Sequence, residues 1–444
     1  MIEKIKKIRA VQIPLIFSLL IMFGTLFVFL WGPIPWITTW DWAAWVTVLL
    51  LILYFVAFAI GYLFCVRKSE KIEDKEKPLI DVEKVERLLK VTIYISFVLT
   101  IANAFLYSGA SNIVELFQKM VVGLTDPDTA YFSKDASSRM GSVVVWITFF
   151  YSPILYLTNV AGLFLFKKLT ILQKCCYCAT LVVELMRWLA VGTNKGLFDI
   201  VLLFLFMYIM MIVMYMGNKE EHTEKNKKTI IYISVGVFAA IVLFFMYFNS
   251  AISARVGGAY KKEYFMDFPY NLVPEQLRFF LAKADSYLTQ GYANMVKIIR
   301  NCEWKWTFGI GNSRFLMDCF ERVFGIDMTL RTYPYQLAAY GVDPLASWHS
   351  AYAWFASDLS FVGIIPFMFG VGYFMCGLVR DVLKHKDMVA LALLYLVFLS
   401  IVNASCTNYV LAYTNGFMGF WCLFALRIFK GTIQKIINRW SRKK

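Results

Sequence analysis

Long apolar stretches, each about twenty residues, recur from one end of this chain to the other. Wound as a helix, a stretch of this length spans the hydrocarbon core of a lipid bilayer. Hydrophobic residues make up 59% of the 444 residues, against about 45–50% in soluble domains. We therefore predict an all-α, polytopic helical membrane protein with about ten transmembrane helices. They are expected at Val11–Gly32, Trp42–Val66, Val91–Ser108, Gly141–Phe166, Leu169–Val191, Leu197–Gly217, Thr229–Asn249, Ala351–Val379, Met388–Cys406 and Tyr409–Phe429.

Lysine and arginine concentrate in the connections on one side of these helices, which sets the predicted orientation. The basic connections precede Val11, follow Arg427, and occupy Arg67–Lys90, Lys167–Lys174, Asn218–Lys228 and Arg380–Asp387. The short connections on the opposite side hold only Lys119, Lys134, Arg139 and Lys195. Because short basic loops stay in the cytoplasm, both termini are predicted to be cytoplasmic. Contact with anionic headgroups then explains the net charge of +15, so no nucleic-acid partner is expected.

The predicted helices divide the chain into three parts. Residues 1–249 hold seven helices, residues 250–350 form a large external loop with short helices, and residues 351–444 hold three helices and a basic cytoplasmic tail. Within the loop, the amphipathic pattern from Pro274 to Arg300 predicts a helix. A glycine-rich turn and a second amphipathic stretch follow in "CEWKWTFGIGNSRFLMDCF". Ordered external loops of this size usually carry function, so we expect the site here.

Neither the cysteines nor the acidic pairs of the sequence indicate a metal site. Cys302 and Cys319 are the two cysteines within the external loop, and the sequence leaves open whether they form a disulfide or remain buried thiols. The acidic pair in "TDPD" (Thr125–Asp128) encloses a proline and is typical of a turn. We therefore assign no metal ligand.

His349 is the only one of the three histidines that is predicted to be external. A neutral imidazole accepts a proton near pH 7, because its reference pKa is about 6.5. Alternatively, a histidine at a membrane interface hydrogen-bonds a headgroup or a carbonyl. Asp358 follows nine residues later, which on one continuous helix is half a turn out of phase and about 13.5 Å along the axis. Unless the helix begins after His349, we expect Asp358 to contact a neighbouring span or the substrate instead.

Three basic residues are predicted near external helix ends, where they suit an anion. Arg187 lies three residues after Glu184, and Lys195 follows the turn in "VGTNKG" at the start of the next helix. Arg255 comes shortly after the span that ends at Asn249. Arginine donates to two phosphate oxygens at once, and a helix N-terminus beside a lysine favours phosphate. The alternative is that Glu184 neutralises Arg187 in a structural ion pair.

Several segments of the chain resemble the Wzy-type oligosaccharide repeat-unit polymerases of bacterial O-antigen, capsule and exopolysaccharide assembly. These segments are "LMRWLAVGTNKGLFDI", "SYLTQGY", "WTFGIGNS" and "WHSAYAWFASDLSFVGIIPFMFG". The layout is also similar, with both ends inside and a large external loop before the last spans. Where many members carry Asp-Phe-Gly, this chain has "DLSFVG", and where many carry a basic residue shortly after the turn glycine, it has "GTNKG".

The resemblance implies a glycosyltransferase of the bacterial plasma membrane that needs no metal or nucleotide cofactor. Its substrate would be an oligosaccharide on a polyprenyl pyrophosphate, and its partners would be membrane lipids and the chain-length regulator and flippase proteins. His349 would be the catalytic base, and the pyrophosphate would bind Arg187, Lys195 and Arg255. Further substrate contacts would come from Asp358, Tyr352, Arg278, Arg314 and Trp306.

Two other functions remain open on the sequence. The closer one is an O-antigen-type ligase that transfers the lipid-linked glycan to another acceptor, because that family shares the layout and an external histidine with arginines. The other is a flippase or transporter for lipid-linked oligosaccharide. A transporter is expected to place cations along a central cavity, whereas the basic residues here are predicted to be unpaired and at external helix ends, which favours an enzyme.

Overall fold

The computed structural model describes residues 2–69, 82–126, 129–130, 143–193, 195–217, 261–344 and 347–429. Within these ranges all regular structure is helical, which confirms the predicted all-α class. The α-helices are α1 (Ile2–Trp31), α2 (Trp42–Ser69), α3 (Val82–Ser108), α4 (Ile113–Thr125), α6 (Val143–Phe164), α7 (Ile171–Ala190), α8 (Lys195–Gly217), α10 (Glu275–Asn301), α11 (Arg314–Phe324), α12 (Tyr333–Gln336), α13 (Ala351–His385), α14 (Met388–Val402) and α15 (Thr414–Ile428).

Six of these helices, namely α1, α2, α3, α6, α8 and α13, are long and apolar enough to cross a membrane. They coincide with six of the predicted spans and support a multi-pass membrane protein. The predicted spans Leu169–Val191, Met388–Cys406 and Tyr409–Phe429 correspond to α7, α14 and α15, of which α14 is a shorter apolar helix. The predicted span Thr229–Asn249 lies outside the described residues.

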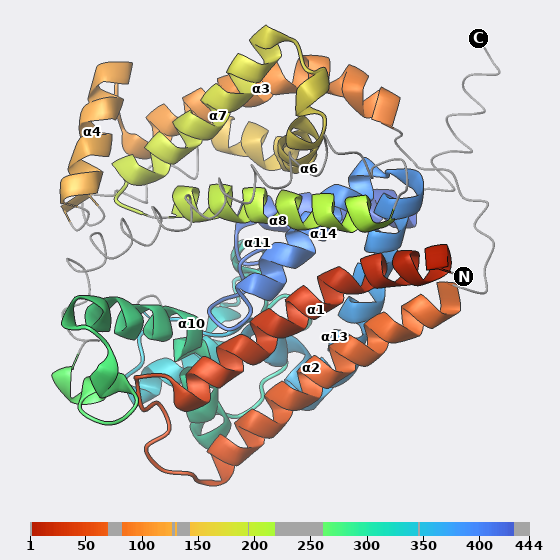
Figure 1. The fold of residues 1–444 in the computed structure, drawn as a ribbon. Coiled ribbons are helices and arrows are strands. Elements are labelled where there is room, and N and C mark those ends of the chain that lie inside the picture. The colour runs from red at the N-terminus through yellow and green to blue at the C-terminus, as the bar shows by residue number, and fades with distance from the viewer. Residues whose placement is uncertain are drawn as a thin grey trace.

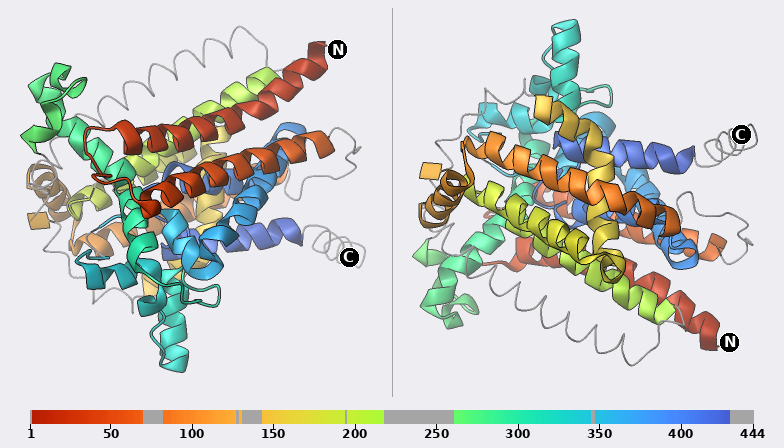
Figure 2. Two further views of the ribbon diagram at one scale, coloured as in Figure 1. Left: turned by 90° about the horizontal axis from the view of Figure 1, so that it is seen from below. Right: turned by 90° about the horizontal axis from the view of Figure 1, so that it is seen from above.

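Most of the long helices run side by side, while α6 crosses them at a steep angle (Figures 1 and 2). The start of α1 and the end of α15 lie at one end, while α10 lies toward the other, which we call the α10 end (Figure 2). The turn between α7 and α8 also lies toward the α10 end (Figures 1 and 2). Residues predicted to share an external site therefore gather at one end of the bundle.

Helices α2 and α13 pack with their backbones in contact. A Cβ atom built on Gly61 of α2 would lie 2.0 Å from the Phe369 carbonyl oxygen. One built on Gly372 of α13 would lie 2.0 Å from the Phe58 carbonyl oxygen. Only glycine allows so close an approach, and small residues at the interface are typical of helix pairs within membranes. This contact holds α13, and with it the segment that precedes α13.

Helix α13 is interrupted at Ser360, whose backbone has φ 62° and ψ 164°. The Tyr54 hydroxyl donates to the Phe361 carbonyl oxygen at 2.7 Å, and the Gly363 N–H donates to Ser360 Oγ at 3.3 Å. These bonds satisfy backbone groups that the interruption would otherwise leave without a helical partner. The predicted span Ala351–Val379 corresponds to α13, and the interruption divides this helix into residues 351–359 and a second segment that follows Ser360.

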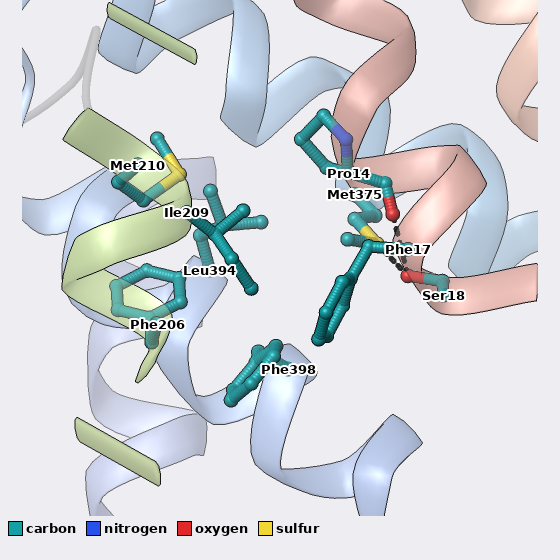
Figure 3. A pocket seen from close by; sticks show the side chains of 9 residues that line it. All are labelled: Pro14, Phe17, Ser18, Phe206, Ile209, Met210, Met375, Leu394 and Phe398. Carbon is teal, nitrogen blue, oxygen red and sulfur yellow. Dashed lines mark hydrogen bonds between the residues drawn. The ribbon is translucent and has the colours of Figure 1, made fainter. Parts of the chain in front are cut away.

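The interior between α1, α8, α13 and α14 is closely packed (Figure 3). A cavity of about 10 Å³ lies there, which is room for about one water molecule. Its lining is apolar apart from Ser18, whose hydroxyl donates to the Pro14 carbonyl oxygen at 2.8 Å. Ser18 follows Pro14 by four residues in α1, so this is the bond that a serine side chain commonly makes to the i−4 carbonyl of its own helix. The four helices therefore pack closely against one another at this point.

Candidate active site

His349 lies in the short segment that leads into α13, and two neighbouring elements hold that segment. On one side, the Asn294 side chain of α10 donates to the Trp348 carbonyl oxygen at 2.8 Å, and Gln290 Oε1 accepts from the Trp348 N–H at 3.1 Å. On the other side, the Ala351 N–H donates to a carbonyl oxygen of the α14–α15 loop at 2.8 Å. The position of His349 is thus fixed by backbone contacts to α10 and to the α14–α15 loop.

The His349 imidazole is buried and neutral. Its side chain is 2% exposed, and among the described residues neither ring nitrogen has a hydrogen-bond partner. Burial, and to a lesser extent the positive charge of Lys297, lowers the pKa of His349 to about 4. Because buried polar groups are normally paired, two orphaned nitrogens on one ring mark a site that awaits a partner. An imidazole in this state is able to accept a proton.

Tyr352 is a second buried group without a polar partner. It lies one helical turn beyond His349 in sequence, is 1% exposed, and its hydroxyl makes no hydrogen bond. Its ring stacks on Tyr292 of α10, with centroids 6.3 Å apart, and tilts against Tyr54 of α2 at 5.1 Å. The Tyr292 hydroxyl, by contrast, is 3.2 Å from Thr25 Oγ1. Among these aromatic residues, the Tyr352 hydroxyl is therefore the one left for a ligand.

Asp358 organises the glycine-rich loop that precedes α11. Its carboxylate accepts from the Thr307 hydroxyl, from the Gly311 N–H at 3.1 Å, and from the Asn312 N–H at 3.0 Å and side-chain amide at 2.7 Å. Helix α13 begins at Ala351, after His349, so the helical spacing that separated Asp358 from His349 in the sequence argument does not apply. The hydrogen bonds of the Asp358 carboxylate nevertheless go to the loop before α11, so Asp358 positions this loop instead of facing His349.

Arg187 lies near the C-terminal end of α7, where it pairs with Glu184. Arg187 Nε donates to Glu184 Oε2 at 2.9 Å, and Nη2 contacts Oε1. The guanidinium carbon lies 4.2 Å from the centroid of the Trp188 ring and 5.0 Å from that of Tyr107. The Trp188 Nε1–H donates to Glu184 Oε1 at 2.8 Å, which fixes the indole. Arginine on an aromatic ring combines ionic and cation–π stabilisation.

Lys195 begins α8 and reaches the same indole. Its Nζ lies 5.4 Å from the Trp188 ring centroid and 2.6 Å from Asp199 Oδ2. The Tyr409 hydroxyl, from the α14–α15 loop, contacts both Lys195 Nζ and Asp199 Oδ1. The prediction that these basic residues are unpaired is therefore wrong, since Glu184 and Asp199 neutralise them. We call Glu184, Arg187, Trp188, Lys195 and Asp199 the cation cluster.

The α14–α15 loop connects the cation cluster with the His349 segment. Tyr409 contacts the cluster, and five residues earlier the Ala404 carbonyl oxygen accepts from the Ala351 N–H. Five residues of extended chain reach at most about 18 Å, which limits the distance between the Cα atoms of Ala404 and Tyr409. Between them, the Asn408 side chain donates to the Asn312 carbonyl oxygen at 2.7 Å, so the loop before α11 joins the same assembly.

Of the remaining predicted residues, two are exposed, one bonds to the backbone and one lies outside the described residues. Arg278 Nε donates to the Val273 carbonyl oxygen at 2.8 Å, so it stabilises the turn before α10. Arg314 is exposed at the first position of α11. Trp306 is 52% exposed, and its ring centroid lies 4.6 Å from that of Phe308. Arg255 lies outside the described residues.

Sequence reasoning missed the carboxylate and the phenol that hold Lys195. Asp199 follows Lys195 by four residues on one helix, a spacing that favours an ion pair and that could have been found. Tyr409 is separated from Lys195 by more than two hundred residues, and no local pattern marks it. Thr307 and Asn312, the partners of Asp358, are hidden in the same way.

Among the described residues, no three His, Cys, Asp or Glu side chains gather in a way that could hold a metal ion. Cys302 and Cys319 are both free thiols. No protein-family model, no curated protein and no solved structure matches the chain.

Proposed function

We propose that this protein is a metal-independent glycosyltransferase that polymerises polyprenyl-pyrophosphate-linked oligosaccharide repeat units at the external face of the bacterial plasma membrane. The observation that carries the proposal is that Arg187 and Lys195 both contact the Trp188 ring, within a loop assembly that also holds the unpartnered His349. A cationic pair and a neutral buried base that are held by the same loop suit a reaction whose leaving group is a diphosphate.

Each part of the site has one role in the proposed reaction. The acceptor hydroxyl of one lipid-linked repeat attacks the anomeric carbon of another, and its proton passes to His349. The bond between that carbon and the pyrophosphate oxygen breaks, so negative charge develops on the departing pyrophosphate. Arg187 and Lys195 stabilise this charge. Because the leaving group is already activated, the step requires neither a nucleotide nor a metal ion.

The ion pairs within the cation cluster leave donors for an anion. Arg187 donates to Glu184 through Nε and Nη2. Among the described residues, its Nη1 makes no hydrogen bond. Lys195 has three N–H donors and directs two of them to Asp199 and Tyr409. Glu184 and Asp199 thus hold the cations in place while donors remain for phosphate oxygens.

The external orientation is supported by the basic connections and by the placement of the site. The residues of the site lie toward the α10 end, opposite the start of α1 and the end of α15 (Figure 2). Exposed rings also lie in the loop that Asp358 holds, where Trp304 is 50% and Trp306 is 52% exposed. Such rings suit stacking on the sugars of a lipid-linked substrate.

The decisive experiment incubates the purified full-length protein, reconstituted in vesicles, with a lipid-linked repeat unit and separates the products by size. A ladder of repeat numbers supports the proposal. Transfer of the glycan to a different acceptor without a ladder would indicate a ligase and overturn it. Movement of the substrate across the vesicle membrane without bond formation would indicate a flippase and overturn it equally.

A further inference from the structure

Helix α11 is strongly amphipathic. At about 100° per residue, its charged side chains share one side of the helix and its apolar side chains share the other. The charged side holds Arg314, Asp318, Glu321 and Arg322. The apolar side holds Phe315, Leu316, Met317, Cys319, Phe320, Val323 and Phe324. Met317 is the one fully buried residue of this helix, so the apolar side is only partly covered by the protein.

The base of α11 packs against two helices of the bundle, and its far end does not. The Phe315 ring lies 4.9 Å from Phe149 of α6 and 5.7 Å from Phe417 of α15, measured between centroids. Toward the far end, Val323 is 73% exposed and Phe324 is 61% exposed. Figure 2 shows the turquoise α11 projecting from the bundle, across the direction of the long helices. An amphipathic helix that lies along a membrane surface has this orientation.

The base of α11 lies against the start of α6. Phe149 lies six residues beyond Val143, the first residue of α6, which is about 9 Å of helix. Phe315 therefore touches α6 within its first two turns. The surface next to this contact is apolar and exposed, since Trp146 is 45% and Phe150 is 63% exposed on α6. The apolar side of α11 is thus continuous with the lipid-facing surface of a candidate span.

We propose that α11 is an interfacial helix whose apolar side inserts into the bilayer surface at the α10 end, with its charged side in water. Interfacial helices bury their apolar side about 5–10 Å into the boundary between headgroups and acyl chains. A contact between two copies of the chain would not require α11 to lie in the plane of the membrane, nor to continue the exposed surface of α6. Since α11 directly follows the loop bound to Asp358, its insertion anchors that loop at the membrane surface. The proposal is independent of the reaction that the protein catalyses.

The test places a photoreactive diazirine amino acid at Val323 in the full-length protein, reconstituted in vesicles of phosphatidylethanolamine and phosphatidylglycerol. The matched control carries the same probe at Glu321, on the charged side of the same helix. A probe at Leu20 of α1, which is 67% exposed on a candidate span, shows the yield expected in lipid. After irradiation, mass spectrometry measures covalent lipid on each variant. All three side chains are exposed, so the probes do not disturb the packed interior.

We expect the Val323 probe to capture at least five times more lipid than the Glu321 probe and to approach the Leu20 yield. Equal lipid capture at Val323 and Glu321 would overturn the proposal, as would reaction of the Val323 probe with water alone. Crosslinking of Val323 mainly to a second copy of the chain would assign this surface to self-association instead. If the Val323 variant does not insert, a probe at Phe324 on the same side tests the same outcomes.

Discussion

Asp358 and Asn312 are joined by two hydrogen bonds, from the Asn312 N–H at 3.0 Å and from its side-chain amide at 2.7 Å. With the bonds from Thr307 and Gly311, the carboxylate satisfies four buried or half-buried donors. The long-range contact fastens the loop before α11 onto the first segment of α13. Hydrogen bonds to a charged group are worth about 1.5–3 kcal/mol each, although such contributions are not additive.

Replacing Asp358 by alanine should therefore release the loop. We expect Asp358→Ala to lower the free energy of unfolding by about 3 kcal/mol, because several donors lose their acceptor. Thermal unfolding in detergent measures this effect, and chymotrypsin should cut faster at Trp304 and Trp306. The control Asp318→Ala, on the charged side of α11, should change stability by less than about 0.5 kcal/mol. Equal shifts for the two variants would show that the Asp358 contacts contribute little.

The cation cluster predicts a selective loss of activity when Arg187 becomes glutamine. If Arg187 stabilises the leaving pyrophosphate, Arg187→Gln should reduce polymer formation by about a hundredfold, as loss of one charge-stabilising donor does in other enzymes. Product laddering from purified protein provides the measurement.

Arg427→Gln is the matched control for this loss. Arg427 Nη1 lies 2.5 Å from Asp381 Oδ2, and the Arg427 side chain is 20% exposed, against 11% for Arg187. The Arg427→Gln substitution therefore breaks a comparable ion pair at the opposite end of the bundle, and we expect this variant to retain most polymer formation. A similar loss in both variants would reduce the role of Arg187 to stability.

Burial of His349 predicts a defined pH dependence of stability. The folded protein holds the pKa of His349 at about 4, whereas the unfolded chain has a value of about 6.5. As pH falls from 6.5 toward 4, the unfolded state gains a proton that the folded state excludes, so stability is lost across this window. The full difference amounts to about 3 kcal/mol. Above pH 7 the imidazole is neutral in both states and contributes no slope.

The measurement compares thermal unfolding of the wild-type protein and His349→Gln between pH 4 and pH 8. We expect the wild type to lose stability relative to the variant only below about pH 6.5. The same variant should leave lipid-linked repeats unpolymerised at neutral pH, because glutamine does not accept the proton. Parallel pH profiles for the two proteins would contradict the burial of a neutral imidazole.

The contact between α2 and α13 predicts opposite outcomes for two neighbouring glycines. Gly372→Ala would bring a methyl group to 2.0 Å from the Phe58 carbonyl oxygen, so the helices must separate, and we expect a loss of about 2 kcal/mol. Gly370→Ala meets nothing within 4 Å and should be neutral or stabilising by up to about 1 kcal/mol, because alanine favours helix. Melting temperatures in detergent distinguish the two variants. A loss of stability well below about 2 kcal/mol for Gly372→Ala would contradict the contact.

The fold was predictable wherever local pattern carried the information. The lengths of the apolar runs located six long helices, and the amphipathic pattern located α10 within one or two residues and indicated a helix in the place of α11. The turn before Lys195 was also predictable, since its residues interrupt two apolar runs. The interruption of α13 at Ser360 was not, because the sequence around it is compatible with a continuous helix.

Hydrophobic length and charge distribution act locally, so the chain alone indicates a helical membrane protein, the approximate places of its main helices and the candidate residues His349, Arg187 and Lys195. Only the folded molecule decides how those residues are used. It buries His349, brings the Tyr409 hydroxyl to Lys195 and gives Asp358 to a loop that is 46 residues away in sequence. Such contacts join residues far apart in the chain, where neither periodicity nor spacing records which partners will meet.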